Sequence, residues 1–361
     1  MSSGDTNLLS ALETRLADEF RLMAIDAGDC PVFFAVAMPV HPVAENANPR
    51  LPCGRGLTRA EAALSAMGEA VELRACLATA DKAASLAYST RDGLARVVGE
   101  NLGTVQPESL QAQHVFLDWA DVTGEPEIFR ANTNGCAAWP NLEGATQCGL
   151  LECIERDARA LWWYGRLQCP KLPLHFLDDI QPRLAWWLQR RRRDHALIDI
   201  TCDTLVPVIA AVSWEPDGSN VAIGSSAAPT LAAATISATT EMLQIEIAMD
   251  VGNVAGNGEL LAWQSTANAH QLQQFSGLVS TGQAEELSRP VADHLLALGH
   301  DVFRYNFTDP DDILKTVRMI TPNLGGLHRN QRPQRIMEFL ARNPSLTTVR
   351  SMAELDPREP Y

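Results

Sequence analysis

Two pairs of glutamates are spaced so that they could do chemistry together. Glu69 follows Ser65 by four positions and precedes Glu72 by three, and Glu152 precedes Glu155 by three. On a helix, these spacings place side chains on one face. If the two faces met, the four carboxylates would repel one another unless a cation lay between them. Carboxylate oxygens favour Mg²⁺, which commonly bridges to phosphate. The alternative is a pair of ordinary amphipathic helices with solvated glutamates.

The usual phosphate-binding loops are missing from the sequence. It contains no G-x-x-x-x-G-K-[ST] motif, and Gly54-Arg55-Gly56 lacks the third glycine of a dinucleotide-binding loop. The only lysines are Lys82, Lys171 and Lys315, and none lies in such a motif. A nucleotide would therefore have to be held by carboxylate-bound metal, arginines and loop amides. Arg55, just before the first glutamate pair, could reach a phosphate or be an ordinary surface arginine.

Three long segments predict the helices that would position these residues. They cover 58–80, 143–163 and 231–249, and Thr58 with Glu61 forms a capping box at the first. A further helix is predicted over 8–23 and another over 334–342. Shorter apolar runs predict strands at 32–38, 115–120, 127–131, 197–202 and 206–214, and segments 46–56 and 133–141 are interpreted as loops. Strands joined by tight turns, with long helices between them, are typical of an α+β fold with mixed, mostly antiparallel sheets.

Composition and charge exclude several classes of protein. A net charge of −15 on 361 residues argues against nucleic acid as the main partner. The first seven residues lack the pattern of a signal peptide, and no apolar run is long enough to span a bilayer, so we expect a cytoplasmic protein. The eight cysteines show neither C-x-x-C nor cysteine–histidine metal spacing, which predicts reduced thiols. The basic run 190–193 is interpreted as the solvated end of a helix, or as a docking site for an acidic peptide.

At these residues the sequence resembles the YcaO family. The matching stretches are SAMGEAVE at 65–72, Asn134-Gly135, ECIERDA at 152–158, LVPV at 205–208 and TEMLQ at 240–244. The resemblance implies a YcaO-like fold around a nucleotide site and the cofactors ATP and Mg²⁺. It also implies metal ligands at Glu69, Glu72, Glu152 and Glu155, nucleotide contacts from Ser65 and Arg156, and Glu241 and Gln244 beside the nucleotide. We expect one catalytic domain over 1–361, with the match strongest over 54–249 and a C-terminal part with a proline-containing tail over 250–361.

Within the family, the run from Glu155 to Tyr164 resembles the azoline-forming members. It implies an ATP-dependent cyclodehydratase that makes thiazoline or oxazoline rings at Cys, Ser or Thr of a ribosomally made precursor peptide, as in bacteriocin biosynthesis. The implied partners are this precursor peptide, a leader-binding protein and a flavin-dependent dehydrogenase, in a hetero-oligomer. Thioamide or amidine formation on a peptide is the alternative chemistry, and a non-catalytic nucleotide-binding scaffold is the alternative of a different class.

Two features depart from the family pattern. Azoline-forming members commonly end in a P-x-P-x-P tail whose terminal carboxylate acts as a base, whereas this chain ends in Pro357-Arg-Glu-Pro360-Tyr361. We predict that Tyr361 still places its carboxylate at the site. Some members carry Glu and Gln eight and four positions before the first glutamate of E-x-x-E-R, where this chain has Gly144 and Cys148.

Overall fold

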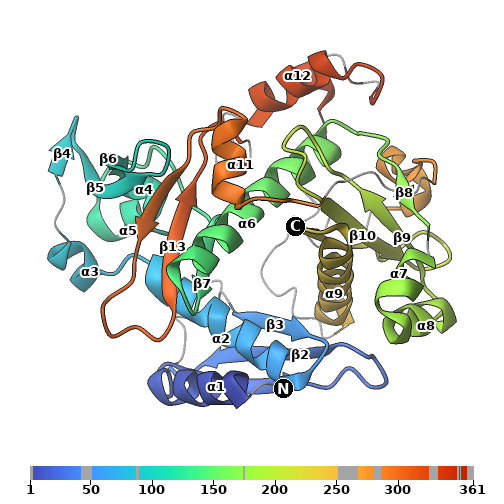
Figure 1. Ribbon diagram of the computed structural model, residues 1–361, viewed down its shortest axis with the longest axis horizontal. Coiled ribbons are helices and arrows are strands. Elements are labelled where there is room, and N and C mark those ends of the chain that lie inside the picture. The colour runs from blue at the N-terminus through green and yellow to red at the C-terminus, as the bar shows by residue number, and fades with distance from the viewer. Residues whose placement is uncertain are drawn as a thin grey trace.

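Three antiparallel sheets and four long helices surround the centre of the molecule (Figure 1). The computed structural model describes residues 3–41, 51–86, 89–173, 175–250, 267–279, 286–324, 332–347, 349 and 351–355. All strand pairings within the three sheets are antiparallel. The predicted class, α+β with mostly antiparallel sheets and long helices, is therefore confirmed.

The first sheet lies under helix α2. It has the order β1-β2-β3, and its elements with the flanking helices are α1 (Ser3–Arg15), β1 (Phe20–Ile25), β2 (Phe33–Pro39), β3 (Cys53–Gly56) and α2 (Arg59–Cys76). The capping box is present, because the Thr58 hydroxyl accepts a hydrogen bond from the Glu61 N–H and the Glu61 carboxylate accepts one from the Leu57 N–H. Strand β3 packs closely on α2, since a Cβ on Gly54 would lie 2.1 Å from the Ala62 carbonyl oxygen.

The second sheet has six strands and is covered by short helices. Its elements are α3 (Ala80–Ser85), β4 (Ser89–Arg91), β5 (Leu94–Asn101), β6 (Gln106–Gln111), α4 (Ala112–Val115), α5 (Trp119–Thr123), β7 (Cys136–Trp139), β12 (Phe303–Asn306) and β13 (Lys315–Ile320). The strand order is β4-β5-β12-β13-β7, with β6 also paired to β5. Residues 176 to 182 positions apart in the chain, in β7 and β13, thus become paired neighbours.

Several predicted elements in the first half of the chain are wrong. The strand pair predicted at 115–120 and 127–131 is absent: short helices α4 and α5 bury Phe116 and Trp119 instead. A short apolar run does not distinguish a strand from a buried helical turn. The predicted helix 8–23 ends at Arg15, and its last residues form β1. The segments interpreted as loops contain β3 and β7, whose pairing is with distant strands.

The third sheet contains the strands predicted at 197–202 and 206–214 and packs against the helix predicted at 231–249. It has the order β11-β10-β9-β8, and its elements are β8 (Lys171–Leu172), α7 (His175–Ile180), α8 (Pro182–Arg190), β9 (Asp194–Asp199), β10 (Val208–Trp214), β11 (Ala222–Ala227) and α9 (Leu231–Asp250). The turn after β10 closes with a 2.7 Å hydrogen bond from the Gly218 N–H to the Glu215 carbonyl. Helix α9 packs against β10 and β11.

Helix α6 (Leu142–Tyr164) lies between the second and third sheets (Figure 1). It begins at the cap residue Asn141, whose side chain accepts a hydrogen bond from the Gly144 N–H. Its apolar face joins the largest core cluster, where Trp162 and Trp163 are fully buried, as expected for core packing at the helix end. Helices α11 (Val291–Ala297) and α12 (Arg332–Arg342) pack on α6 from the C-terminal part of the chain.

The basic run after α8 is not simply a solvated helix end. Arg191 lies 2.6 Å from Glu246 of α9, and Arg193 lies 3.0 Å from Glu215. Their side chains are only 10% and 17% exposed. These two arginines join α9 to the third sheet, while Arg190 and Arg192 remain exposed. Among the described helices, none is long and apolar enough to cross a membrane.

Candidate functional site

The four predicted glutamates meet at the centre of the molecule, between α2, α6 and the loops that face them. Each carboxylate accepts one hydrogen bond from a different segment of the chain. The donors are the Cys53 N–H to Glu69 (2.9 Å), the Ala138 N–H to Glu72 (2.8 Å), the Gly135 N–H to Glu152 (3.0 Å) and the Ser225 hydroxyl to Glu155 (2.8 Å). Among the described residues, the second oxygens of Glu69, Glu72 and Glu155 make no hydrogen bond. The carboxylates are thus oriented and still able to accept a ligand.

The Asn134-Gly135 turn delivers one of these donors because its second residue is glycine. Gly135 has a φ of 81°, in the left-handed region. A Cβ at this position would lie 2.4 Å from the Met319 carbonyl oxygen. The Gly135 carbonyl also accepts a 2.7 Å hydrogen bond from the Met319 N–H in β13. Only glycine fits both this backbone conformation and the close approach to β13. The structure therefore explains why the motif has glycine at this position.

Burial makes all four carboxyl groups hard to ionise. It raises the pKa of Glu69 and of Glu155 from 4.5 to about 7, and the pKa of Glu72 and Glu152 also lies above its usual value. The charges also act on one another, because Glu152 and Glu69 raise the pKa of Glu72 further. Such a cluster is stable at neutral pH only with protons or with cations close by.

Arg156 supplies the positive charge nearest to the second pair. Its guanidinium lies 3.2 Å from Glu155 and 3.5 Å from Glu152, and its side chain is 30% exposed. Burial alone would lower the pKa of Arg156, but the two carboxylates outweigh burial and hold it above the usual value. Its Nε has no hydrogen-bond partner among the described residues. One arginine does not neutralise four carboxylates, so the site keeps an excess of acidic groups.

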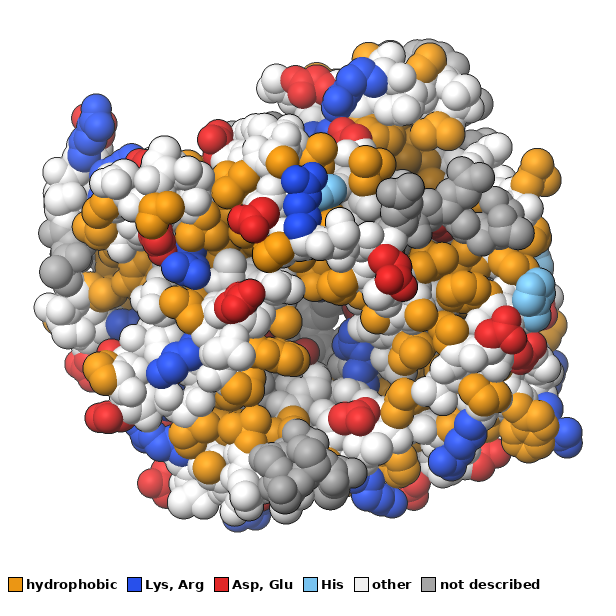
Figure 2. Space-filling view, in the orientation of Figure 1, with side chains coloured by type: hydrophobic (Ala, Val, Ile, Leu, Met, Phe, Trp, Pro, Cys, Tyr) orange, Lys and Arg blue, Asp and Glu red, His pale blue; other side chains and the backbone are white. Residues whose placement is uncertain are grey.

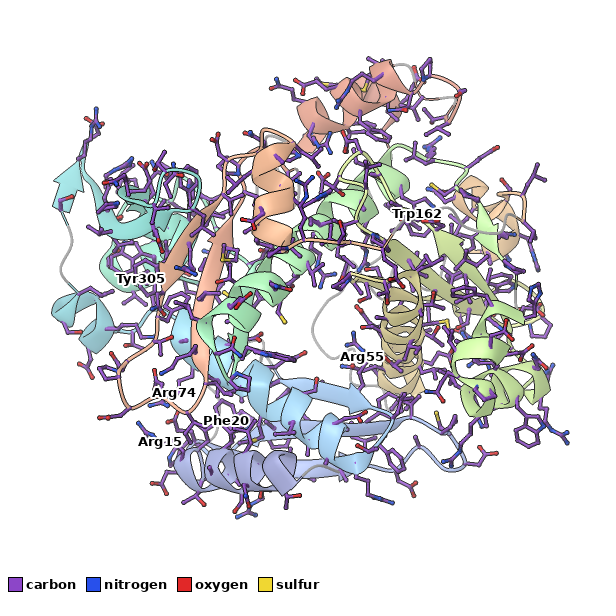
Figure 3. All side chains as sticks on the ribbon, viewed as in Figure 1. Arg15, Phe20, Arg55, Arg74, Trp162 and Tyr305 are labelled. Carbon is purple, nitrogen blue, oxygen red and sulfur yellow. The ribbon has the colours of Figure 1, made fainter. Side chains whose placement is uncertain are left out.

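Arg55 joins the site to α9. Its guanidinium donates to Thr240 (3.3 Å), Gln244 (3.2 Å) and Glu241 (3.1 Å), which all lie on one face of the helix. Glu241 also raises the pKa of both Glu69 and Glu155, so it belongs to the same group of charges. Arg55 is therefore not an ordinary surface arginine, and its side chain is 22% exposed. Figure 3 shows Arg55 between β3 and α9, and Figure 2 shows the face of the molecule hollowed beside this position.

For the other candidate residues from the sequence that fall among the described residues, the structure shows the location but no side-chain hydrogen bond to the four glutamates. Ser65 is half-buried on α2, one turn before Glu69. Cys148 lies near Glu72, because burial and then that carboxylate raise the pKa of its thiol to about 11. Gly144 packs under the Trp139 indole, since a Cβ there would lie 1.9 Å from the ring. Tyr361 lies outside the described residues.

The sequence patterns did not indicate the roles of three residues around the site. Ser225 holds Glu155 from an apolar strand that gave no signal of this role. Thr240 stands in the TEMLQ stretch that matches the family, but its contact with Arg55 is seen only in the structure. Arg318 of β13 is fully buried beneath the Gly135 turn, where it donates to the Asn132 carbonyl and to the Cys136 sulfur. Only the tertiary pairing of β13 with β7 brings it there.

The donor set fits a magnesium ion that is shared with phosphate. In the part of the chain that the structure describes, no three or more His, Cys, Asp or Glu side chains are close enough to hold a metal ion together. Mg²⁺ is usually held by one or two carboxylates, with water and phosphate oxygens completing its octahedron. The available carboxylate oxygens of Glu69, Glu72 and Glu155 match this mode of binding.

Two curated relatives match about half of the chain. An uncharacterised protein of Methanothermobacter thermautotrophicus is 30% identical over an alignment of 208 residues that covers 52% of this chain and 53% of the relative. An uncharacterised protein in the tfuA 3′ region of Rhizobium leguminosarum bv. trifolii is 28% identical over an alignment of 220 residues that covers 53% of this chain and 50% of the relative. The chain thus spans about half the length of these relatives.

Solved structures share the fold at low sequence identity. A heterocyclase in complex with substrate and cofactor has a TM-score of 0.79 and 18% identity, over 98% of this chain and 57% of that one. YcaO from Methanopyrus kandleri, bound with AMPPCP and Mg²⁺, has a TM-score of 0.66 and 19% identity, over 89% and 91%. The Escherichia coli microcin synthetase McbBCD complex contains a chain with a TM-score of 0.61 and 13% identity, over 84% and 87%.

A family model described as YcaO cyclodehydratase, ATP- and Mg²⁺-binding, matches residues 79–325. The match covers Glu152, Glu155, Arg156, Glu241 and Gln244 and extends well beyond the 249 limit of the motifs. It begins after Glu69 and Glu72, which the fold nevertheless brings to the same centre. The matched residues are more than half of the sequence. The chain therefore belongs to the YcaO family of ATP- and Mg²⁺-binding cyclodehydratases.

Proposed function

We propose that this chain is the ATP-dependent cyclodehydratase subunit that forms thiazoline or oxazoline rings at Cys, Ser or Thr of a ribosomally made precursor peptide. The observation that carries the proposal is a group of four neighbouring carboxylates, buried at Glu155 and half-buried at Glu69, Glu72 and Glu152, each oriented by a separate hydrogen bond and each with a raised pKa. Such a cluster suits a cation and the phosphates that it binds. Family membership supplies the reaction class.

In the proposed reaction, a Cys, Ser or Thr side chain adds to the carbonyl carbon of the preceding amide and loses its proton. Bound ATP supplies the phosphoryl group that turns the former amide oxygen into a leaving group. Phosphate then departs as the C=N bond of the ring forms and the amide nitrogen loses its proton. The net change is peptide and ATP to azoline peptide, ADP and phosphate.

The chain's own residues would bind and orient the reactants. We assign Glu69, Glu72, Glu152 and Glu155 to Mg²⁺ and, through it, to the phosphates. Ser65 and Arg156 would contact the nucleotide directly. Arg55, Glu241 and Gln244 form a fixed network at the α9 side of the site, which would border the nucleotide. A Tyr361 carboxylate at the site would serve as the base.

Calorimetry tests the nucleotide site first. We expect Mg²⁺-dependent ATP binding by the purified chain that disappears in Glu72→Gln and Glu155→Gln, because each change removes one metal-seeking charge at nearly constant shape. Glu143→Gln, on the exposed first turn of α6, is the matched control and should bind as the wild type does. Absence of ATP binding in the wild type, alone and with partner proteins, would contradict the assignment of the four glutamates to Mg²⁺ and nucleotide.

Mass spectrometry of the product tests the chemistry. An azoline product has lost one water per ring, whereas a thioamide has exchanged one oxygen for sulfur. We expect water loss at Cys, Ser or Thr that depends on ATP and on Glu155. Exchange of oxygen for sulfur would instead establish the thioamide alternative at the same site.

The proposed function also includes partner proteins and a peptide substrate. The microcin synthetase neighbour is a complex of several proteins, and one of its structures contains bound pro-MccB17. By analogy we propose that this chain works in a hetero-oligomer, with a precursor peptide, a leader-binding protein and a flavin-dependent dehydrogenase. Copurification with the products of neighbouring genes would test this assembly.

A further inference from the structure

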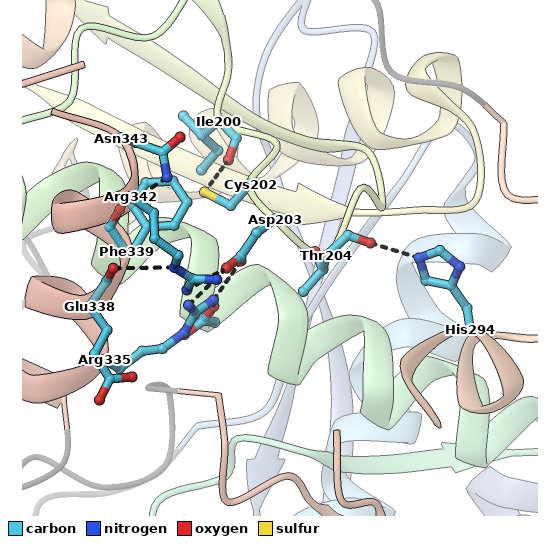
Figure 4. Close-up of polar contacts among 11 residues, drawn as sticks. Ile200, Cys202, Asp203, Thr204, His294, Arg335, Glu338, Phe339, Arg342 and Asn343 are labelled. Atoms are coloured by element: carbon cyan, nitrogen blue, oxygen red, sulfur yellow. Dashed lines mark hydrogen bonds and ion pairs between the residues drawn. The ribbon is translucent and has the colours of Figure 1, made fainter. Parts of the chain in front are cut away.

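Arg335 of α12 makes paired contacts with two aspartates, and Figure 4 shows its contact with Asp203. Its guanidinium donates two hydrogen bonds to Asp157, from Nη2 (2.7 Å) and from Nε (3.2 Å). It donates two more to Asp203, from Nη2 (2.6 Å) and from Nη1 (3.0 Å). The Asp157 side chain is 1% exposed and that of Arg335 is 10% exposed. Pairs of this geometry need the planar fork of arginine, and truncating one partner would leave a buried carboxylate uncompensated.

The two aspartates lie on the helix that carries Glu155 and in the sheet that carries Ser225. Asp157 lies on α6, two residues after Glu155. Asp203 lies in the turn between β9 and β10, and β10 pairs with β11, which carries Ser225. The hydrogen bond from Ser225 to Glu155 therefore joins α6 to the third sheet, and Arg335 joins the same helix to another part of that sheet.

The turn that carries Asp203 is held by a second C-terminal helix. His294 of α11 is buried, and its Nε2 lies 2.7 Å from the Thr204 carbonyl oxygen (Figure 4). Arg289 donates to Nδ1 of the same ring, so the proton is on Nε2 and the histidine donates to Thr204. Arg342 adds an exposed contact to Asp203 at 3.1 Å. The turn is thus fixed from α11 and α12 together.

Helix α12 is itself firmly docked on α6. Its Ile336, Phe339 and Leu340 side chains are buried in the same core cluster as the apolar face of α6. Beyond the helix, the Thr347 hydroxyl donates to the Gly165 carbonyl, just after α6 ends. Arg335 therefore acts from a rigid support.

We infer that Arg335 is a positioning residue for the glutamate site. Successive side chains of a helix differ by about 100° in direction, so fixing Asp157 also fixes where Glu155 and Arg156 point. Holding Asp203 sets the position of the sheet that presents Ser225. The affinity of the site for magnesium and nucleotide then depends on the docked helix α12, which reaches none of the four glutamates among the contacts described. The inference rests on the proposed nucleotide site.

The main test measures binding of Mg²⁺ with a non-hydrolysable ATP analogue by calorimetry. We expect Arg335→Gln and Asp157→Asn each to weaken binding about 10–100-fold, the range found for groups that orient metal ligands. The double variant should bind no more weakly than Arg335→Gln alone, because Arg335→Gln already removes the pair with Asp157. Arg335→Lys keeps the charge but cannot pair with both carboxylates, and should bind as poorly as Arg335→Gln. Arg342→Gln, which removes only the exposed contact to Asp203, is the control and should change binding less than about twofold.

Hydrogen exchange provides a readout that does not need nucleotide. We expect faster exchange of the amides of 152–158 in Arg335→Gln than in Arg342→Gln, in folded protein well below its melting temperature. Loss of thermal stability with unchanged exchange at 152–158 and unchanged analogue binding would overturn the inference. If the wild type does not bind the analogue, the proposed function fails, and the exchange result alone decides whether Arg335 positions α6.

Discussion

At the scale of single residues, burial decides the charge of the site. The four glutamates are each held by a hydrogen bond that favours the ionised form, yet desolvation outweighs it and raises the pKa. A carboxyl group whose pKa rises on folding binds its proton more tightly in the folded state. Through Glu69 and Glu155, the ligand-free protein therefore loses stability as pH rises from about 4.5 to about 7, and a bound cation reverses this loss.

Glu155→Gln should reveal this effect directly. Because the pKa of Glu155 moves from 4.5 to about 7, its ionisation destabilises the ligand-free fold by on the order of 2–3 kcal/mol. We expect the variant to gain melting temperature relative to the wild type at about pH 8 and little at about pH 5. Scanning calorimetry without metal or nucleotide at both pH values checks this. The exposed Glu143→Gln should show no such difference, and an equal effect of Glu155→Gln at the two pH values would contradict the assigned cause.

At the scale of elements, close backbone contacts place the glutamate helices. Strand β3 approaches α2 so closely that only a glycine fits at position 54, and this approach brings the Cys53 N–H to Glu69. The Gly135 turn does the same for Glu152 at the start of β7. The site therefore depends on backbone positions in segments that look like irregular loops in the sequence.

Gly54→Ala and Gly68→Ala form a matched pair that tests this dependence. The new Cβ at position 54 would lie 2.1 Å from the Ala62 carbonyl oxygen, whereas nothing lies within 4 Å of one at position 68. We expect Gly54→Ala to destabilise the fold by about 1–3 kcal/mol, as overpacking does. Gly68→Ala, inside α2, should stabilise it by about 0.5–1 kcal/mol. Urea unfolding of both variants measures this, and an equal effect of the two would show that β3 and α2 separate easily.

At the scale of the whole molecule, the site lies where segments of the three sheets meet the helices α2 and α6. Donors to the four glutamates come from the first sheet (Cys53), from the second (Ala138) and its preceding turn (Gly135), and from the third (Ser225). A ligand bound at this junction contacts elements that must stay together for the fold to persist. Binding should therefore raise the stability of the whole chain.

Thermal unfolding with saturating Mg²⁺ and ATP checks this expectation. At a ligand concentration of about 100 times the dissociation constant, binding adds about 2.7 kcal/mol. For a chain of 361 residues, with an unfolding entropy of about 2.1 cal/mol/K per residue, that corresponds to a rise of roughly 3–4 °C in melting temperature. The shift should need both ligands and be absent in Glu72→Gln. A rise of the same size in melting temperature with ATP alone would show that ATP binds without Mg²⁺, and would contradict the proposed role of the glutamates as metal ligands.

Local sequence patterns are enough to identify the three helices that carry the site and the glutamates on them. Helix periodicity and caps predicted α2, α6 and α9 to within a few residues, because long amphipathic segments contain many repeats of the 3.6-residue period. The spacing of Glu69 with Glu72 and of Glu152 with Glu155 fixed which faces they share. The hairpin β9–β10 and the turn after it were equally readable, since their pairing is local.

Which segments of the chain come together at the site follows from tertiary contacts and could not be predicted from local sequence. The strands β3 and β7 are short and form through pairing with distant strands, so local sequence did not predict them. The Ser225 and Thr240 contacts, the buried Arg318 and the Arg335 pairs join residues far apart in the chain, and no spacing rule relates them. The raised pKa of the glutamates likewise arises from burial, which a sequence pattern of charged residues does not contain. Local periodicity shows which side chains share a face of a helix. Tertiary packing sets which segments that face contacts and, through burial, the pKa of its carboxyl groups.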